Sequence, residues 1–76
     1  MSAASRVLLL FASIHGVLAA EARLKAAHIS MDMIPVPKEI SAECGMAITV
    51  AAADRARALD ALAGTRLVRI LDDWNP

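Results

Sequence analysis

The spacing of apolar residues changes twice in the first half of the chain. Positions 7–11 hold five bulky apolar residues, which is typical of a buried β-strand. Positions 14–27 then carry apolar residues three and four apart, and Ser13 stands where a hydroxyl commonly caps a helix. Alternation returns over 29–36. The pattern predicts a strand, a helix and a second strand, with these helix residues inward: Ile14, Val17, Leu18 and Leu24.

The second half repeats this order with shorter segments. Asp54 is placed to start a second helix and Gly64 to stop it. Pro35 and Pro37 lack the amide that a central strand donates, so the second strand is predicted at a sheet edge. The further predicted elements are strands over 46–50 and 67–71, a helix over 53–63, a loop over 37–45 and a polar tail over 72–76.

The resulting order is strand, helix, strand, strand, helix, strand. Two strand-helix-strand units in so short a chain predict an α+β fold of the ferredoxin-like βαββαβ type, with a four-stranded antiparallel sheet and two helices on one face. The first strand is expected at the centre. Both alternating sets of residues 7–11 are apolar, so the sheet face opposite the helices is also expected to be partly apolar. That face is predicted to be a homodimer interface or a partner-binding surface.

Composition narrows the class of protein. The chain has 76 residues, no net charge and one cysteine. This length fits a single domain over 1–76, with a core of about 6–71. A lone cysteine forms no internal disulfide and favours a reducing, cytoplasmic setting. A neutral chain with two aromatic residues gives no indication of binding to nucleic acid or to a membrane surface.

Residues 1–22 also look like a signal peptide, with Arg6 as the charged flank. His15 and Gly16 interrupt the apolar run, and its removal would leave roughly 55 residues without a disulfide, near the lower limit for folding. The run is also too short to span a bilayer. A buried first strand is therefore the favoured interpretation.

Cys44 is the only strong nucleophile, and it precedes Gly45 in the predicted loop. Glycine suits a turn that leaves its neighbour accessible, although cysteine is also among the most often buried residues. Glu39 and Glu43 would disfavour a thiolate and Lys38 would favour it, so nearby charges leave the reactivity of Cys44 open.

Three side chains of the first helical segment are further candidates. Glu21 falls within the predicted inward stripe, where it would either pair with Lys25 or accept hydrogen bonds from amides of the 37–45 loop. His15 lies in the first turn, where it could help to position an anionic group or a thiolate, or simply be solvated. Ser13 is the expected cap.

No second cysteine or glycine-rich phosphate loop is present, so neither a metal site nor a cofactor is predicted.

One set of residues stands out when the motifs are taken together: Phe11, Ser13, His15, Glu21, the run Ile34-Pro35-Val36-Pro37-Lys38-Glu39-Ile40-Ser41 and the pair Cys44-Gly45. With these residues the chain resembles a known family, the putative selenium/sulfur carrier protein-like proteins. Lys38 stands where that family more often has arginine, a planar and bidentate anion binder.

The resemblance implies a carrier rather than a turnover enzyme. Cys44 would hold sulfur or selenium as a persulfide or selenyl-sulfide, received from a cysteine desulfurase or a selenium donor and passed to an acceptor enzyme. The alternative is a non-catalytic interaction or small-ligand-sensing module that uses the open sheet face and the cleft between the first helix and the proline-rich loop. The supporting pocket expected around Cys44 comprises Ser13, His15, Glu21, Pro35, Pro37, Lys38, Ser41 and Gly45.

Overall fold

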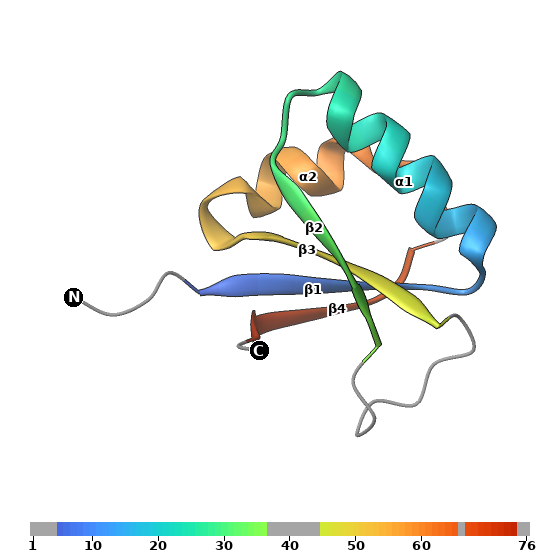
Figure 1. The fold of residues 1–76 in the computed structure, drawn as a ribbon. Coiled ribbons are helices and arrows are strands. Elements are labelled where there is room, and N and C mark those ends of the chain that lie inside the picture. Colours follow the sequence, from blue (N-terminus) through green and yellow to red (C-terminus); the bar gives the residue numbers. More distant parts are fainter. Residues whose placement is uncertain (1–4, 37–44, 66, 75–76) are drawn as a thin grey trace.

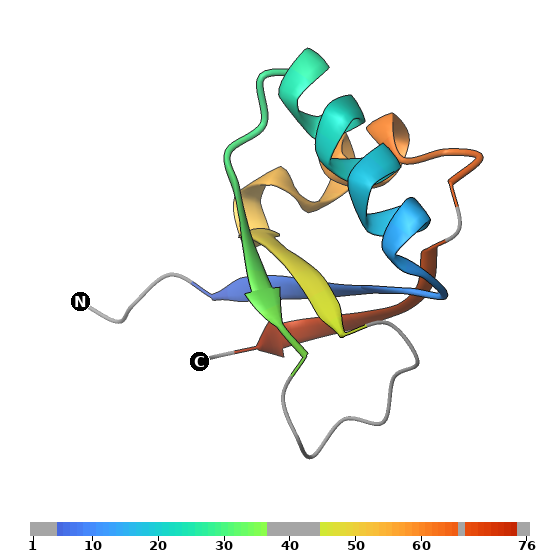
Figure 2. The ribbon, with the colours of Figure 1, turned by 45° about the vertical axis from the view of Figure 1, so that its right-hand side comes forward.

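A computed structural model of the chain describes residues 5–36, 45–65 and 67–74. These residues form one four-stranded sheet and two α-helices, and Figures 1 and 2 show both helices on the same side of the sheet. The elements in chain order are β1 (Arg6–Phe11), α1 (Ile14–Ala26), β2 (Met31–Pro35), β3 (Met46–Ala51), the 3-10 turn η1 (Ala52–Asp54), α2 (Arg55–Ala61) and β4 (Leu67–Trp74).

The strand order across the sheet is β2-β3-β1-β4, and every neighbouring pair is antiparallel. In the two central strands Leu9 lies opposite Ile48. The strand that contains Pro35 lies at an edge, where its missing amide costs no hydrogen bond within the sheet. The predicted ferredoxin-like α+β fold is confirmed, with β1 at the centre as expected.

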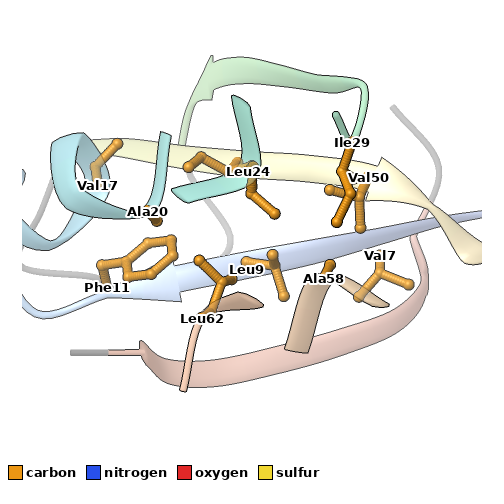
Figure 3. Packing of buried hydrophobic residues seen from close by; sticks show 11 residues of the cluster. Val7, Leu9, Phe11, Val17, Ala20, Leu24, Ile29, Val50, Ala58 and Leu62 are labelled. Atoms are coloured by element: carbon orange, nitrogen blue, oxygen red, sulfur yellow. The ribbon is translucent and has the colours of Figure 1, made fainter. Parts of the chain in front are cut away.

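The apolar run of β1 supplies both faces of the sheet. Val7, Leu9 and Phe11 face the helices and contact the inner side of α1, where Val17, Ala20 and Leu24 are fully buried (Figure 3). Leu8 and Leu10 point to the other face because neighbouring side chains of a strand alternate. There they form a second buried cluster with Ala47, surrounded by the partly buried residues Ile34, Val36, Leu71 and Trp74. The predicted apolar character of the second face is thus confirmed.

Helix α1 begins at the predicted residue. Ser13 Oγ accepts a hydrogen bond from the amide of Gly16 at 3.4 Å, so its predicted role as a cap is confirmed. The prediction that Ile14 and Leu18 point inward is wrong, because their exposed fractions are 45% and 50%. The buried stripe follows Val17, Ala20 and Leu24, and Ile14 and Leu18 lie on its flank.

The second helical segment is shorter than the predicted range 53–63. It opens with the 3-10 turn η1, and Asp54 occupies the N-cap position of α2 without a side-chain capping bond. The Asp54 carboxylate instead contacts Arg57 Nη1 at 3.2 Å. Gly64 follows the helix with φ of 84°, a left-handed conformation that confirms its predicted role in ending the segment.

The prediction of a polar tail after residue 71 is wrong for Asp72, Asp73 and Trp74. These residues continue β4, and Trp74 pairs with Arg6 and packs beside the second cluster. The extension includes a register shift, at which Asp73 adopts a φ of 55°.

Among the residues that the structure describes, no helix has the length and hydropathy of a membrane span.

Candidate functional site

The candidate site is built at one end of the sheet, called here the hairpin end. At this end β1 and β2 finish while β3 and β4 begin, since Pro35 pairs with Met46, Leu10 with Ala47 and Phe11 with Leu67. The start of α1 and the connection between β2 and β3 therefore belong to the same end of the molecule. The topology alone places Ser13 and Gly45 there, although they are far apart in sequence.

Gly45 is the described residue next to the cysteine. Its carbonyl oxygen accepts a hydrogen bond from the amide of Val36 at 3.1 Å, which closes the β2-β3 hairpin at its base. Gly45 is exposed, its backbone is not left-handed, and a Cβ atom added to it would meet none of the other described residues within 4 Å. One peptide unit joins Cys44 to this position. Four predicted site residues lie outside the described residues: Pro37, Lys38, Ser41 and Cys44.

Pro35 is the last residue of β2 and is exposed. Its ring fixes φ, and the following residue, Val36, makes the hydrogen bond to Gly45. The connection 37–44 therefore departs from a strand end that is held by both a proline and a hairpin hydrogen bond.

Glu21 lies in the middle of α1 with 30% of its side chain exposed. Its Oε2 atom is 3.3 Å from Lys25 Nζ, so the predicted pair with Lys25 is confirmed. Such a pair stabilises a helix by a few tenths of a kcal/mol, roughly 0.2–0.5. The second expectation, hydrogen bonds from loop amides, concerns residues 37–44 and lies outside the described residues.

His15 is exposed in the first turn of α1 and lines an open hollow of about 230 Å³. This hollow lies between α1 and the turn that leads into β4, and its other lining residues are Gly16, Ala19, Arg23, Gly64 and Thr65. Gly45 is not part of its wall. The structure therefore brings His15 together with Arg23 and the β4 turn, a grouping that the sequence analysis missed. Part of this grouping could have been predicted from the sequence. His15, Ala19 and Arg23 are spaced four residues apart, so they follow one side of the helix.

Thr49 is a buried polar residue in the apolar strand β3, with an exposed fraction of 2%. Its Oγ1 atom accepts hydrogen bonds from Arg6 Nε at 3.2 Å and Arg6 Nη2 at 3.1 Å, and Arg6 also lies 3.4 Å from Asp32. These contacts satisfy the buried hydroxyl and tie the edge strand β2 to the central strand β1.

Within the described part of the chain, no three His, Cys, Asp or Glu side chains are grouped as metal ligands would be.

The fold and the site define a small ferredoxin-like α+β domain with a cysteine-glycine pair immediately before β3. The chain belongs to the family described as Putative Se/S carrier protein-like, whose sequence model matches residues 6–69. This confirms the resemblance seen in the sequence, and the matched range contains all nine predicted site residues, from Ser13 to Gly45. No curated protein and no solved structure matches the chain.

Proposed function

We propose that this protein is a sulfur or selenium carrier in which Cys44 is the atom-carrying residue. The observation that carries the proposal is the family match over residues 6–69, because the family is described as a carrier and Cys44 is the only cysteine in the chain. A carrier of this kind needs one accessible thiolate and a partner at each end of the transfer, and it needs no bound cofactor.

The proposed loading step exchanges one sulfur-sulfur bond for another. The Cys44 thiolate attacks the outer sulfur of a persulfide on the donor, which is a cysteine desulfurase in the sulfur case. The donor's S–S bond breaks, its cysteine leaves as a thiolate, and a persulfide forms on Cys44. No external oxidant is needed, because the outer sulfur moves with its oxidation state unchanged. Attack by an acceptor thiolate on the outer sulfur of loaded Cys44 then releases it in the same way.

The surroundings of Gly45 support this proposal. The hydrogen bond between Val36 and Gly45 holds the two ends of the connection that bears Cys44, so that the chain leaves the sheet at a defined place. The exposed Gly45 offers no side chain against an approaching partner, and no other described residue occupies the space around its missing Cβ. A thiolate exchange requires the attacking and leaving sulfurs to line up, which favours a site without bulky neighbours.

The remaining predicted residues have supporting roles in the proposal. Ser13 fixes the start of α1 at the hairpin end, and Glu21 and His15 contribute polar groups along that helix. Pro35, Pro37 and Ser41 would stiffen the connection, and Lys38 would favour the thiolate form of Cys44 by its charge. The proposed setting is a reducing cytoplasm, where a lone thiol stays available.

The loading reaction gives the test of this function. Full-length protein is incubated with a cysteine desulfurase and cysteine, desalted without reductant and weighed by intact-mass spectrometry. We expect a gain of about 32 Da, the mass of one sulfur, which a later treatment with dithiothreitol removes by thiol exchange. The Cys44→Ser variant should gain nothing under the same conditions.

An equal gain in wild type and Cys44→Ser would contradict the proposal, and so would the absence of any gain in wild type across several desulfurases and a chemical persulfide donor. Folding of both proteins is checked by circular dichroism. Because serine is close to cysteine in size, a difference between the two proteins reports on the sulfur atom.

The competing function is a non-catalytic interaction or ligand-sensing module. The open hollow beside α1 favours it, but this hollow faces the turn before β4 and is not the predicted cleft between α1 and the proline-rich loop. Labelling of the native thiol separates the two functions. A carrier predicts that Cys44 reacts with a thiol reagent in the native state at least as fast as a free cysteine-containing peptide. A thiol that reacts only after denaturation supports the module instead.

A further inference from the structure

The hollow beside α1 differs in charge from the rest of the molecule. The whole chain is neutral, with eight basic and eight acidic residues. Among the described residues, in contrast, the hollow is lined by a histidine, an arginine and small or neutral residues, and none of them carries a carboxylate. Its volume of about 230 Å³ is below the range of about 300–1,000 Å³ that is usual for drug-sized ligands. A small anion fits both the charge and the size.

Arg23 is held in place at one side of the hollow. Its Nη1 atom donates to the carbonyl oxygen of Ala63 at 2.5 Å, which fixes the guanidinium between α1 and the turn after α2. Helical side chains lean toward the helix N-terminus, so Arg23 extends toward Ala19 and the first turn. The other N–H groups of the guanidinium have no acceptor among the described residues. A positioned guanidinium with free N–H groups is the usual protein partner of an oxyanion.

The opposite wall is a fixed turn. The amide and the hydroxyl of Thr65 both donate to the carbonyl oxygen of Leu62, at 3.0 Å and 2.6 Å, and Gly64 is in its left-handed conformation. Ala19 lies between His15 and Arg23 on α1 and also lines the hollow, and its small side chain takes up little of the space between them. His15 adds a ring N–H donor at the end nearest the start of the helix.

We infer that this hollow is a binding site for a small tetrahedral oxyanion of the sulfate or phosphate class. Arg23 is the principal ligand, His15 supplies a second donor, and Ala19 provides the room. The site lies on the β4 side of α1, and Gly45 is not in its wall. The inference does not depend on the proposed transfer of sulfur by Cys44.

The test is a titration with sodium sulfate, and in parallel with sodium phosphate, followed by amide ¹H–¹⁵N NMR. The protein is the full chain with Cys44→Ser, which removes thiol chemistry from the measurement. Sodium chloride keeps the ionic strength constant, because salt screens exposed charges. We expect saturable shifts at residues 15–23 and 63–65, with at least one of the two anions.

Two variants probe the site in different ways. Arg23→Gln removes the guanidinium, and Ala19→Leu places a larger side chain in the lining while leaving Arg23 intact; each should weaken binding about tenfold, or about 1.4 kcal/mol. Lys25→Gln is the matched control, since it removes one positive charge from the same helix outside the hollow and should change binding less than about twofold. Thermal melts verify that all variants are folded.

Shifts that do not saturate, that spread over every basic residue, or that chloride reproduces at equal ionic strength would overturn the inference. Equal weakening by Lys25→Gln and Arg23→Gln would overturn it as well, because binding would then follow net charge. Unchanged binding in Ala19→Leu would show that the anion is bound elsewhere.

Discussion

At the scale of single residues, Gly64 and Gly45 differ in whether the backbone conformation requires a glycine. Gly64 has a φ of 84°, which is strained for any residue with a Cβ atom. Gly45 is not in that region, and a Cβ atom there would meet no other residue of the described ranges within 4 Å. Gly64 is needed by the fold, whereas neither the backbone conformation nor the described neighbours of Gly45 require a glycine there. A glycine without a structural reason beside the candidate carrier cysteine supports a need for open space at the site.

The substitutions Gly64→Ala and Gly45→Ala should therefore differ in kind. Gly64→Ala should lower the free energy of unfolding by about 1 kcal/mol, because alanine disfavours the left-handed region. Gly45→Ala should change it by less than about 0.5 kcal/mol while slowing the loading of Cys44. Urea unfolding and the intact-mass assay measure the two effects. If Gly45→Ala loads at the wild-type rate, the open space there has no part in transfer.

The residues that sequence alone identified are those with local causes. Ser13 caps α1 and Gly64 ends the second helical segment because both effects act within one helical turn. Ile14 and Leu18 were misplaced because periodicity gives the angle between side chains but not which side of the helix meets the sheet. The contact between Arg23 and Ala63 spans 40 residues, and no local pattern predicts it.

At the scale of elements, the last strand, β4, includes polar residues that the sequence pattern assigned to a tail. Asp72 and Asp73 suggest a tail, but Asp72 pairs with Arg55 of α2, with Oδ1 2.6 Å from Nε. Trp74 then lies opposite Arg6 and covers part of the second apolar cluster. The strand persists because its charged residues find partners or solvent while its apolar ones reach the sheet face. Short-range sequence patterns do not contain that information.

Trp74→Ala should therefore destabilise the protein. We expect a loss of about 1–3 kcal/mol in the free energy of unfolding, less than for a fully buried tryptophan because the side chain is only partly covered. Val68→Ala in the same strand is the control, since Val68 is 66% exposed and should change the free energy by less than about 0.5 kcal/mol. Equal effects of the two substitutions would mean that β4 ends before Trp74.

At the scale of the whole molecule, the chain buries apolar residues on both faces of a sheet that has helices on only one. Leu8, Leu10 and Ala47 are at most 3% exposed within a single copy. The predicted homodimer is therefore not required to cover them. It would have to use the surrounding partly buried residues Ile34, Val36, Leu71 and Trp74.

Dimerisation through this face remains a prediction, and analytical ultracentrifugation tests it. We expect dimers at high micromolar concentration that dissociate in Leu71→Lys, because a lysine at the partly buried position 71 would place a charge in the interface. Leu18→Lys is the control, as Leu18 is 50% exposed on α1, on the far side of the sheet. A strict monomer in wild type would remove the dimer from the account.

The fold could be predicted from the sequence more fully than the site. The order of elements and the prolines of the second strand were enough to place β1 at the centre and β2 at the edge. The same topology places Ser13 and Gly45 at the hairpin end. The side chains around them depend on how α1 is rotated over the sheet, which is decided by packing. His15 consequently lines a hollow with Arg23, which shares its side of α1, and with the turn before β4, which no spacing along the helix predicts.

The central claim is that Cys44 receives a sulfur atom and gives it up again, and one time course of intact mass follows both steps. Protein loaded by a cysteine desulfurase is separated from the donor and mixed with an excess of an acceptor thiol protein. We predict that a gain of about 32 Da on this chain disappears as the same mass appears on the acceptor, and that Cys44→Ser shows neither change. A gain that persists in the presence of acceptors, or one that forms without Cys44, would contradict the account.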